Sequence, residues 1–119
     1  MGDESPHIKK FQKELNAGTT SLLVLSTLSK TSMPMYGYQI AKIISTKHED
    51  APIFKHGVIY PVLRSLEKEA LLKSQVEPST SGPPRRYYQI TNTGLDVLKQ
   101  WTEIWYQLST FVNKTLEGE

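Results

Sequence analysis

The sequence predicts a mainly α-helical fold with one small β-hairpin. Apolar residues recur at every third or fourth position along most of the 119 residues, which is the spacing of an amphipathic helix. Only residues 72–77 and 86–90 alternate apolar and polar side chains in the manner of strands. The segment between them, residues 78–84 (PSTSGPP), is too rich in proline and glycine to be helical or to form a central strand. These observations indicate an antiparallel hairpin with a projecting loop, and it is the only sheet that the sequence predicts.

The first two helices are expected in the N-terminal part of the chain. The apolar face of the first helix extends from Ile8 to Leu28, and Gly18 predicts a break that divides this helix into two parts. The second helix is expected from about Tyr36 to His48, after which an Asp-Ala-Pro sequence interrupts the chain.

The third helix is expected to begin around Gly57. We place Pro61 in its first turn, where the missing N–H of proline removes no helical hydrogen bond. The apolar side chains that are expected to point inward are Ile59, Val62, Leu63 and Leu66. The opposite side of this helix is therefore left to face a partner.

A long last helix follows the hairpin, with Thr91 as its expected N-cap. Its apolar face is too wide and too aromatic for a terminal helix that is surrounded by water. We expect this face and the N-terminal helix to pack against a second subunit, and packing within one subunit is the alternative. The residues expected at that subunit interface are Ile8, Phe11, Leu15, Leu98, Trp101, Trp105, Leu108 and Val112.

The chain length fits one domain over residues 1–119, with three helices and the hairpin in 8–90 and the last helix in 91–117. The absence of cysteine excludes a disulfide scaffold and thiolate-bound zinc. No apolar run approaches the roughly 18 residues that span a bilayer, and the first residues lack a signal-peptide pattern. We therefore expect a soluble, cytoplasmic protein with no membrane partner.

The sequence contains none of the short motifs that carry catalytic chemistry. There is no Gly-x-Ser-x-Gly, no His-Glu-x-x-His and no phosphate-binding glycine loop. The three histidines, His7, His48 and His56, have no partners at the spacing of metal ligands. We therefore expect neither an enzyme nor a metal or cofactor site.

The formal net charge of +2 is unevenly distributed along the chain. Residues 30–90 hold nine basic and five acidic side chains, a balance of +4, whereas residues 91–119 have a balance of −2. A basic central segment favours a polyanionic partner. Three helices followed by a hairpin with a basic tip are the layout of a winged helix-turn-helix, here with additional N- and C-terminal helices for dimerisation.

Three segments resemble the PadR family of bacterial transcriptional regulators. They are residues 36–41 (YGYQIA), 57–67 (GVIYPVLRSLE) and 84–94 (PRRYYQITNTG), and the resemblance covers about residues 19–112. The single helix after the wing is similar to the small subfamily. The resemblance implies a homodimer that binds double-stranded DNA and usually represses transcription, with its third helices in successive major grooves. Such helices, one DNA turn or roughly 34 Å apart, require a pseudo-palindromic site.

The sequence departs from the family pattern at three positions. The family usually has histidine at the position of Tyr36, and serine or threonine at the position of Val58. Without that hydroxyl group, one contact with a backbone phosphate is not expected. Ala70 stands where the family has a glycine after the third helix, so a left-handed glycine cap is unavailable and we expect this helix to end differently.

The expected DNA contacts lie on the second helix, the third helix and the wing. Arg64 is the leading base reader, because its guanidinium can bind O6 and N7 of guanine together, and a phosphate contact or a surface ion pair is the alternative. Tyr38 and Tyr60 resemble family residues that hydrogen-bond phosphate, with half-buried packing as the alternative. Basic wing residues can neutralise phosphates or form an ordinary solvated loop, and Arg85 is favoured over Arg86, which alternates inward. The full set is Tyr38, Lys55, His56, Gly57, Val58, Tyr60, Pro61, Arg64, Lys73, Arg85 and Arg86.

The resemblance also implies an aromatic or drug-like effector near the dimer interface. Trp101 and Trp105 lie four residues apart on the last helix and could form flat walls around a planar ligand, with dimer packing as the alternative. Trp105 resembles a recurrent family tryptophan and is the better candidate. The competing function is a winged-helix module that binds protein instead of DNA. Salt separates the two, because phosphate contacts release counterions and weaken steeply as salt rises.

Overall fold

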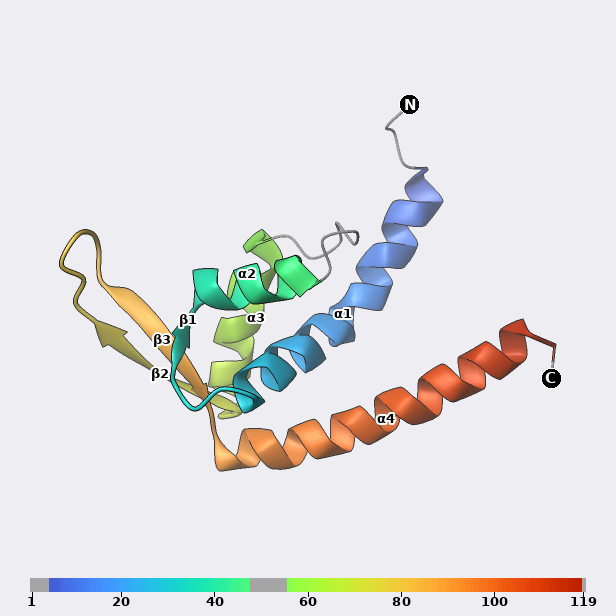
Figure 1. The fold of residues 1–119 in the computed structure, drawn as a ribbon. Helices are drawn as coiled ribbons and strands as arrows, with labels where there is room; N and C mark the ends of the chain where they lie inside the picture. Colours follow the sequence, from blue (N-terminus) through green and yellow to red (C-terminus); the bar gives the residue numbers. More distant parts are fainter. Residues whose placement is uncertain (1–4, 48–55, 119) are drawn as a thin grey trace.

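The residues that the structure describes form four helices and a three-stranded antiparallel sheet (Figure 1). The computed structural model describes residues 5–47 and 56–118, with the side chains of residues 46, 47, 56 and 57 left out. The elements in chain order are α1 (Pro6–Ser29), β1 (Met35–Tyr36), α2 (Gly37–Lys47), α3 (His56–Lys68), β2 (Leu72–Glu77), β3 (Arg85–Ile90) and α4 (Asn92–Leu116). The predicted class, mainly helical with a β-hairpin in a winged-helix arrangement, is confirmed.

The sheet has the strand order β1-β3-β2, so the predicted hairpin of β2 and β3 gains a third strand. The hairpin runs from the pair Leu72 and Ile90 to the pair Glu77 and Arg85. The short strand β1 pairs with the other edge of β3. The predicted hairpin is confirmed, and β1 was not predicted, because a strand of two residues is too short for alternation to reveal it.

Helix α1 is continuous, and the predicted division at Gly18 is wrong. A glycine inside a helix costs only about 1 kcal/mol, which does not break a helix that is packed elsewhere along its length. The hydroxyl of Thr19 donates to the carbonyl of Leu15 at 2.9 Å, so Thr19 adds a bond within the helix and starts no new one. The N-cap is Ser5, whose Oγ accepts from the N–H of Ile8 at 3.2 Å.

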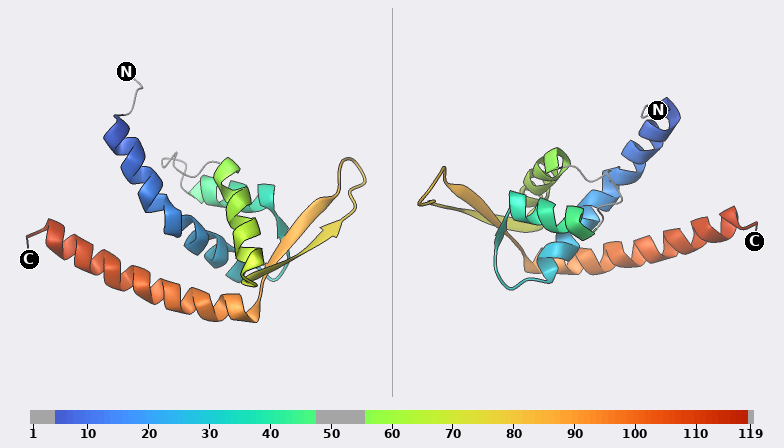
Figure 2. Two further views of the ribbon diagram at one scale, coloured as in Figure 1. Left: turned by 180° about the vertical axis from the view of Figure 1, so that it is seen from behind. Right: turned by 45° about the horizontal axis from the view of Figure 1, so that its top comes forward.

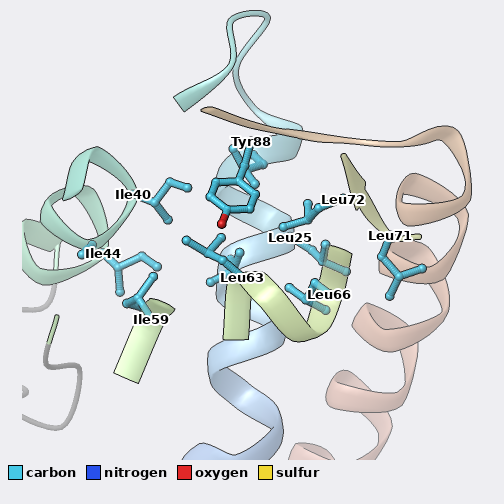
Figure 3. Packing of buried hydrophobic residues seen from close by; sticks show 12 residues of the cluster. Leu25, Ile40, Ile44, Ile59, Leu63, Leu66, Leu71, Leu72 and Tyr88 are labelled. Carbon is cyan, nitrogen blue, oxygen red and sulfur yellow. The ribbon is translucent and has the colours of Figure 1, made fainter. Parts of the chain in front are cut away.

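The core lies where the second half of α1, helices α2 and α3 and the sheet meet (Figure 3). Three of the four side chains predicted to point inward from α3 are buried, and Val62 is half-buried against the core. The buried apolar residues are Val24, Leu25, Leu28, Ile40, Ala41, Ile44, Ile59, Leu63, Leu66, Leu71, Leu72 and Tyr88. The burial of one side of α3 leaves its other side exposed.

Pro61 lies inside α3, in its second turn, because the helix begins at His56. The prediction of a first-turn position is therefore wrong. Proline at this position removes one helical hydrogen bond. Its ring is on the exposed side of the helix, away from the core.

Helix α4 begins at the predicted N-cap. The Oγ1 of Thr91 accepts from the N–H of Gly94 at 2.9 Å and donates to the carbonyl of Ala70 at 2.8 Å. Helices α1 and α4 pack together near this end, and their other ends diverge in all views (Figure 2). None of the described helices combines the length and the apolar character needed to cross a membrane.

The end of α3 has the left-handed cap that the alanine at position 70 was expected to prevent. Ala70 has a φ of 65°, and its N–H donates to the carbonyl of Glu67 at 2.9 Å. The N–H of Leu71 donates to the carbonyl of Leu66 at 3.0 Å, and both leucines are buried. This is the complete Schellman pattern with alanine in the position that glycine usually occupies. The expectation of a different helix end is therefore wrong, because hydrogen bonds and leucine burial outweigh the strain.

We expect Ala70→Gly to raise the free energy of unfolding by about 1 kcal/mol. The left-handed conformation costs a residue with a Cβ atom roughly 1–2 kcal/mol, which exceeds the loss from the greater freedom of glycine in the unfolded chain. Urea denaturation at equal protein concentration measures the change. The matched control, Lys68→Gly in the last turn of α3, should lose about 1 kcal/mol. An Ala70→Gly variant no more stable than the parent would contradict the argument.

Candidate nucleic-acid interface

One face of the molecule brings the exposed side of α3 against the wing. A cleft of about 670 Å³ lies between them. Its basic side chains are Arg64 and Lys68 from α3 and Arg85 and Arg86 from β3. Glu67 is the one acidic side chain in its lining among the described residues. The cleft therefore has a strongly positive balance, which suits an anion.

The structure brings four of the eleven predicted DNA contacts together in this cleft. They are Tyr60, Arg64, Arg85 and Arg86. Val58 and Pro61 are exposed on the same helix, and Tyr38 is exposed on α2. Lys73 is not in the cleft, because β2 directs it to the other face of the sheet, beside Met33 and Tyr87. Lys55 lies outside the described residues, as do the side chains of His56 and Gly57.

Tyr60 is half-exposed and packs against the start of α2. A Cβ atom at Gly37 would lie 2.9 Å from Cδ1 of the Tyr60 ring and closer still to Cε1. The absence of a side chain at Gly37 thus leaves room for the Tyr60 ring against the start of α2. The structure thus shows the packing that was the alternative for Tyr60, and the ring is also accessible, so its phosphate contact stays a prediction.

Arg85 is held over an aromatic ring that the sequence analysis did not include in the site. Its guanidinium carbon lies 4.4 Å from the ring centroid of Tyr36, within the range of a cation–π contact. The Tyr36 ring in turn meets Tyr87 edge-to-face, with centroids 5.4 Å apart and an interplanar angle of 74°. Tyrosine in place of the family's usual histidine thus gives Arg85 a platform. The sequence signal that could have revealed this platform is Tyr36 itself, which begins the first of the three segments that resemble the family.

Arg86 is linked to α3 through a serine. Its Nη1 donates to Ser74 Oγ at 3.0 Å, and this hydroxyl donates to Glu67 Oε2 at 2.5 Å. The chain joins β3, β2 and α3, so it fixes the wing relative to the helix. Arg86 is exposed at the same time, so its inward alternation does not remove it from the surface.

A surface ion pair was one alternative to base reading for Arg64. Among residues 5–47 and 56–118 no such ion pair is found.

Tyr88 lines the cleft from β3 and is 6% exposed. Burial, followed by the nearby carboxylate of Glu67, raises the pKa of the Tyr88 hydroxyl, while Arg86 and Arg64 act in the opposite direction. The phenol therefore remains protonated and neutral at physiological pH. The sequence analysis did not assign this residue to the site, because strand alternation indicates only that it is buried.

A second, apolar surface extends along α1 and α4, away from the cleft. Of the residues predicted at the subunit interface, Ile8, Phe11, Leu15, Trp105, Leu108 and Val112 are exposed in the isolated chain. Leu98 and Trp101 instead pack in part against the core. A cleft of about 520 Å³ between the two helices is lined by both tryptophans, together with Leu15, Leu22, Ile104 and Leu108.

Within the part of the chain that the structure describes, no group of three or more histidine, aspartate or glutamate side chains is placed to hold a metal ion.

Comparison with known proteins gives the family. Residues 24–100 match the transcriptional regulator PadR-like family. The chain is similar to the crystal structure of a PadR family transcriptional regulator from Eggerthella lenta, with 35% identity, coverage of 94% of each chain and a TM-score of 0.77. It is also similar to a transcriptional regulator from Clostridium thermocellum, with 31% identity, 85% of this chain and 96% of that chain covered, and a TM-score of 0.75.

A PadR-like regulator from Bacillus cereus is 31% identical, with 89% of this chain and 99% of that chain covered and a TM-score of 0.70. An uncharacterised protein from Lysinibacillus sphaericus is 28% identical over 83 residues, which are 70% of this chain and 76% of that protein. The family match agrees with the prediction of a regulator instead of an enzyme. On its sequence and its fold, this chain belongs to the PadR-like family of transcriptional regulators.

Proposed function

We propose that this DNA-binding transcriptional regulator is a repressor that acts as a homodimer on a pseudo-palindromic operator and responds to a small aromatic effector. The observation that carries the DNA-binding part is the cleft between α3 and the wing, with four basic side chains and one acidic one. Phosphate groups are the ligands that such a balance favours. A protein of this kind acts where the chromosome is, so we place it in the cytoplasm.

The predicted contacts divide into two roles. Val58, Pro61 and Arg64, on the exposed side of α3, face the major groove, with Arg64 as the base reader. The phosphate contacts come from the two tyrosines and the basic residues of the wing, which are Tyr38, Tyr60, Lys73, Arg85 and Arg86. Lys55, His56 and Gly57, at the start of α3, complete the predicted set.

The exposed apolar surface of α1 and α4 supports the homodimer. Six of the predicted interface residues are exposed there, including Phe11, which is 62% exposed. A contiguous apolar surface of this kind marks an interface with another chain. A two-fold axis through it would place two copies of α3 on one side of the dimer and explain a pseudo-palindromic operator.

The cleft between α1 and α4 supports the effector. Its volume of about 520 Å³ is in the range of small-molecule sites, and Trp101 and Trp105 both line it. A planar compound between these helices would change the separation of the two recognition helices and weaken operator binding. Dimer packing alone remains the alternative role of the two tryptophans.

We expect selection from a randomised duplex pool to enrich an inverted repeat with half-sites about one turn apart. Arg85→Ala should lower the slope of log affinity against log salt by about 0.9, since one phosphate contact is lost. Arg64→Ala should cost about 1–3 kcal/mol and relax base preference at one position of each half-site. Lys114→Ala, a matched loss of charge on α4, should change neither. No enrichment, with weak binding only, would favour the module that binds protein instead of DNA.

We expect Phe11→Glu to convert the dimer to a monomer at micromolar concentration, because the substitution puts a charge into the apolar interface. Analytical ultracentrifugation measures the mass, and far-UV circular dichroism checks the fold. Met33→Glu is the control, because Met33 is a 70% exposed apolar residue on the outer face of the sheet. A monomeric parent protein, or a dimeric Phe11→Glu variant, would refute the proposed interface.

We expect planar aromatic compounds that quench tryptophan fluorescence to weaken operator binding as well. Trp105→Leu should lose both responses while it keeps operator affinity in the absence of ligand, since Trp105 lies outside the core. Fluorescence titration and DNA-binding assays on the same compounds make the comparison. Saturating quenching with unchanged operator affinity would show that the effector mechanism is wrong.

A further inference from the structure

The Tyr88 hydroxyl, at the cleft between α3 and the wing, has no protein partner among the residues that the structure describes. Tyr88 is 6% exposed, and no hydrogen bond to its hydroxyl is found among residues 5–47 and 56–118. Its ring packs in the core beside Ile40 and Leu72, with the oxygen directed toward Leu63 of α3 (Figure 3). The Tyr88 oxygen is not among the fully buried polar atoms without a partner, so solvent reaches it from the cleft and it is open to a ligand. Phenylalanine would fill the same space without offering a donor to the cleft.

The surroundings of this hydroxyl favour an anion as the missing partner. The side chains that act on the pKa of Tyr88 through their charges are Glu67, Arg86 and Arg64, and all three line the cleft. The Glu67 carboxylate is already engaged by Ser74 Oγ, which also accepts from Arg86. Arg86 keeps further N–H donors, because a guanidinium has more than the one that this bond uses. The neutral phenol is itself a donor and adds no negative charge.

The position of the cleft identifies which anion would enter it. Its two walls are the helix that is proposed to read the major groove and the hairpin that is proposed to lie on the neighbouring groove. Two adjacent grooves of DNA are separated by one sugar-phosphate strand. If the two walls occupy adjacent grooves, that strand must pass between them, and its phosphates lie over the cleft.

We propose that this cleft is the site of the phosphodiester strand between the two grooves, and that the Tyr88 hydroxyl donates a hydrogen bond to a phosphate oxygen at its floor. Arg64, Arg85 and Arg86 supply the positive charge on either side. The inference rests on the proposed DNA binding and adds a specific contact to it. It also explains why a polar side chain occupies a core position of the wing.

The test is Tyr88→Phe, which removes one oxygen atom and leaves the ring in the core. We expect duplex affinity to fall about tenfold, the usual effect of losing a hydrogen bond to a charged group. The fall should be equal for the selected repeat and for a fluorescent duplex of unrelated sequence at low salt, because a phosphate contact carries no base information. The melting temperature should stay the same, since the hydroxyl has no protein partner to lose.

Tyr87→Phe is the matched control. Tyr87 is the preceding residue of β3, on the opposite face of the sheet, where it lines a different groove and meets Tyr36 edge-to-face. The same loss of one hydroxyl there should leave affinity for both duplexes within twofold of the parent. A loss of affinity at unchanged stability in Tyr88→Phe is a result that a purely structural tyrosine would not produce.

The outcomes distinguish failure of the Tyr88–phosphate contact from failure of DNA binding itself. If the parent protein binds duplex DNA and Tyr88→Phe binds equally well, the phosphate contact is refuted and DNA binding stands. If Tyr88→Phe loses stability together with affinity, the hydroxyl is structural and the contact is also refuted. If the parent protein binds no duplex at all, the proposed function itself fails, and this inference fails with it.

Discussion

The contact between the first turn of α4 and the backbone that ends α3 determines the relative orientation of the basic cleft and the apolar surface of α1 and α4. A Cβ atom at Gly94 would overlap the carbonyl oxygen of Leu71 and lie 2.7 Å from Cγ1 of Ile90, so only glycine permits this approach. The N–H of Thr91 donates to the Leu71 carbonyl at 3.1 Å, and the Thr91 hydroxyl, which donates to the Ala70 carbonyl, lies at the same distance from the Leu71 oxygen. The direction of α4, with its exposed apolar face, is thus set by the few backbone atoms that terminate the proposed recognition helix.

The same junction accounts for the basic cleft. The left-handed cap at Ala70 leads directly into β2, because Leu71 and Leu72 are both buried and leave no length for a loop. The hairpin therefore starts beside the last turn of α3. This proximity brings Ser74 within hydrogen-bond distance of Glu67 and carries Arg86 to the helix. The burial of one side of α3 leaves its basic side as the wall that the wing faces.

Features that depend on a long pattern could be predicted from the sequence. The helices, the hairpin and the Thr91 cap each follow from spacing or from one local side-chain bond. Where the sequence analysis was wrong or incomplete, longer-range packing outweighed a local preference: Gly18 remains helical, Ala70 adopts the conformation of a glycine, and β1 exists through its pairing with β3.

The candidate site was also predictable only in those features that a sequence pattern reveals. Charge and alternation indicated the wing arginines and Arg64, because exposed positive side chains are visible in a sequence. The tyrosine platform of Arg85, the serine between Arg86 and Glu67, and the hydroxyl of Tyr88 required the register of three strands against α3. Nothing local distinguishes a buried tyrosine whose hydroxyl lies at a cleft from one that only fills the core.

The junction also defines how a ligand between α1 and α4 can affect DNA binding. Such a ligand acts only if it binds one orientation of α4 better than another. Trp101 packs partly against the core, whereas Trp105 lies one helical turn farther out, so a change at Trp105 reaches the rest of the protein through α4 as a rigid element. Because α4 is closely packed at Gly94 and bonded through Thr91, a rotation of α4 at this point presses on Leu71, which joins the end of α3 to the start of the wing. The proposed phosphate cleft is lined by the last turn of α3, so such a rotation acts on the cleft more directly than on the first turn of α3.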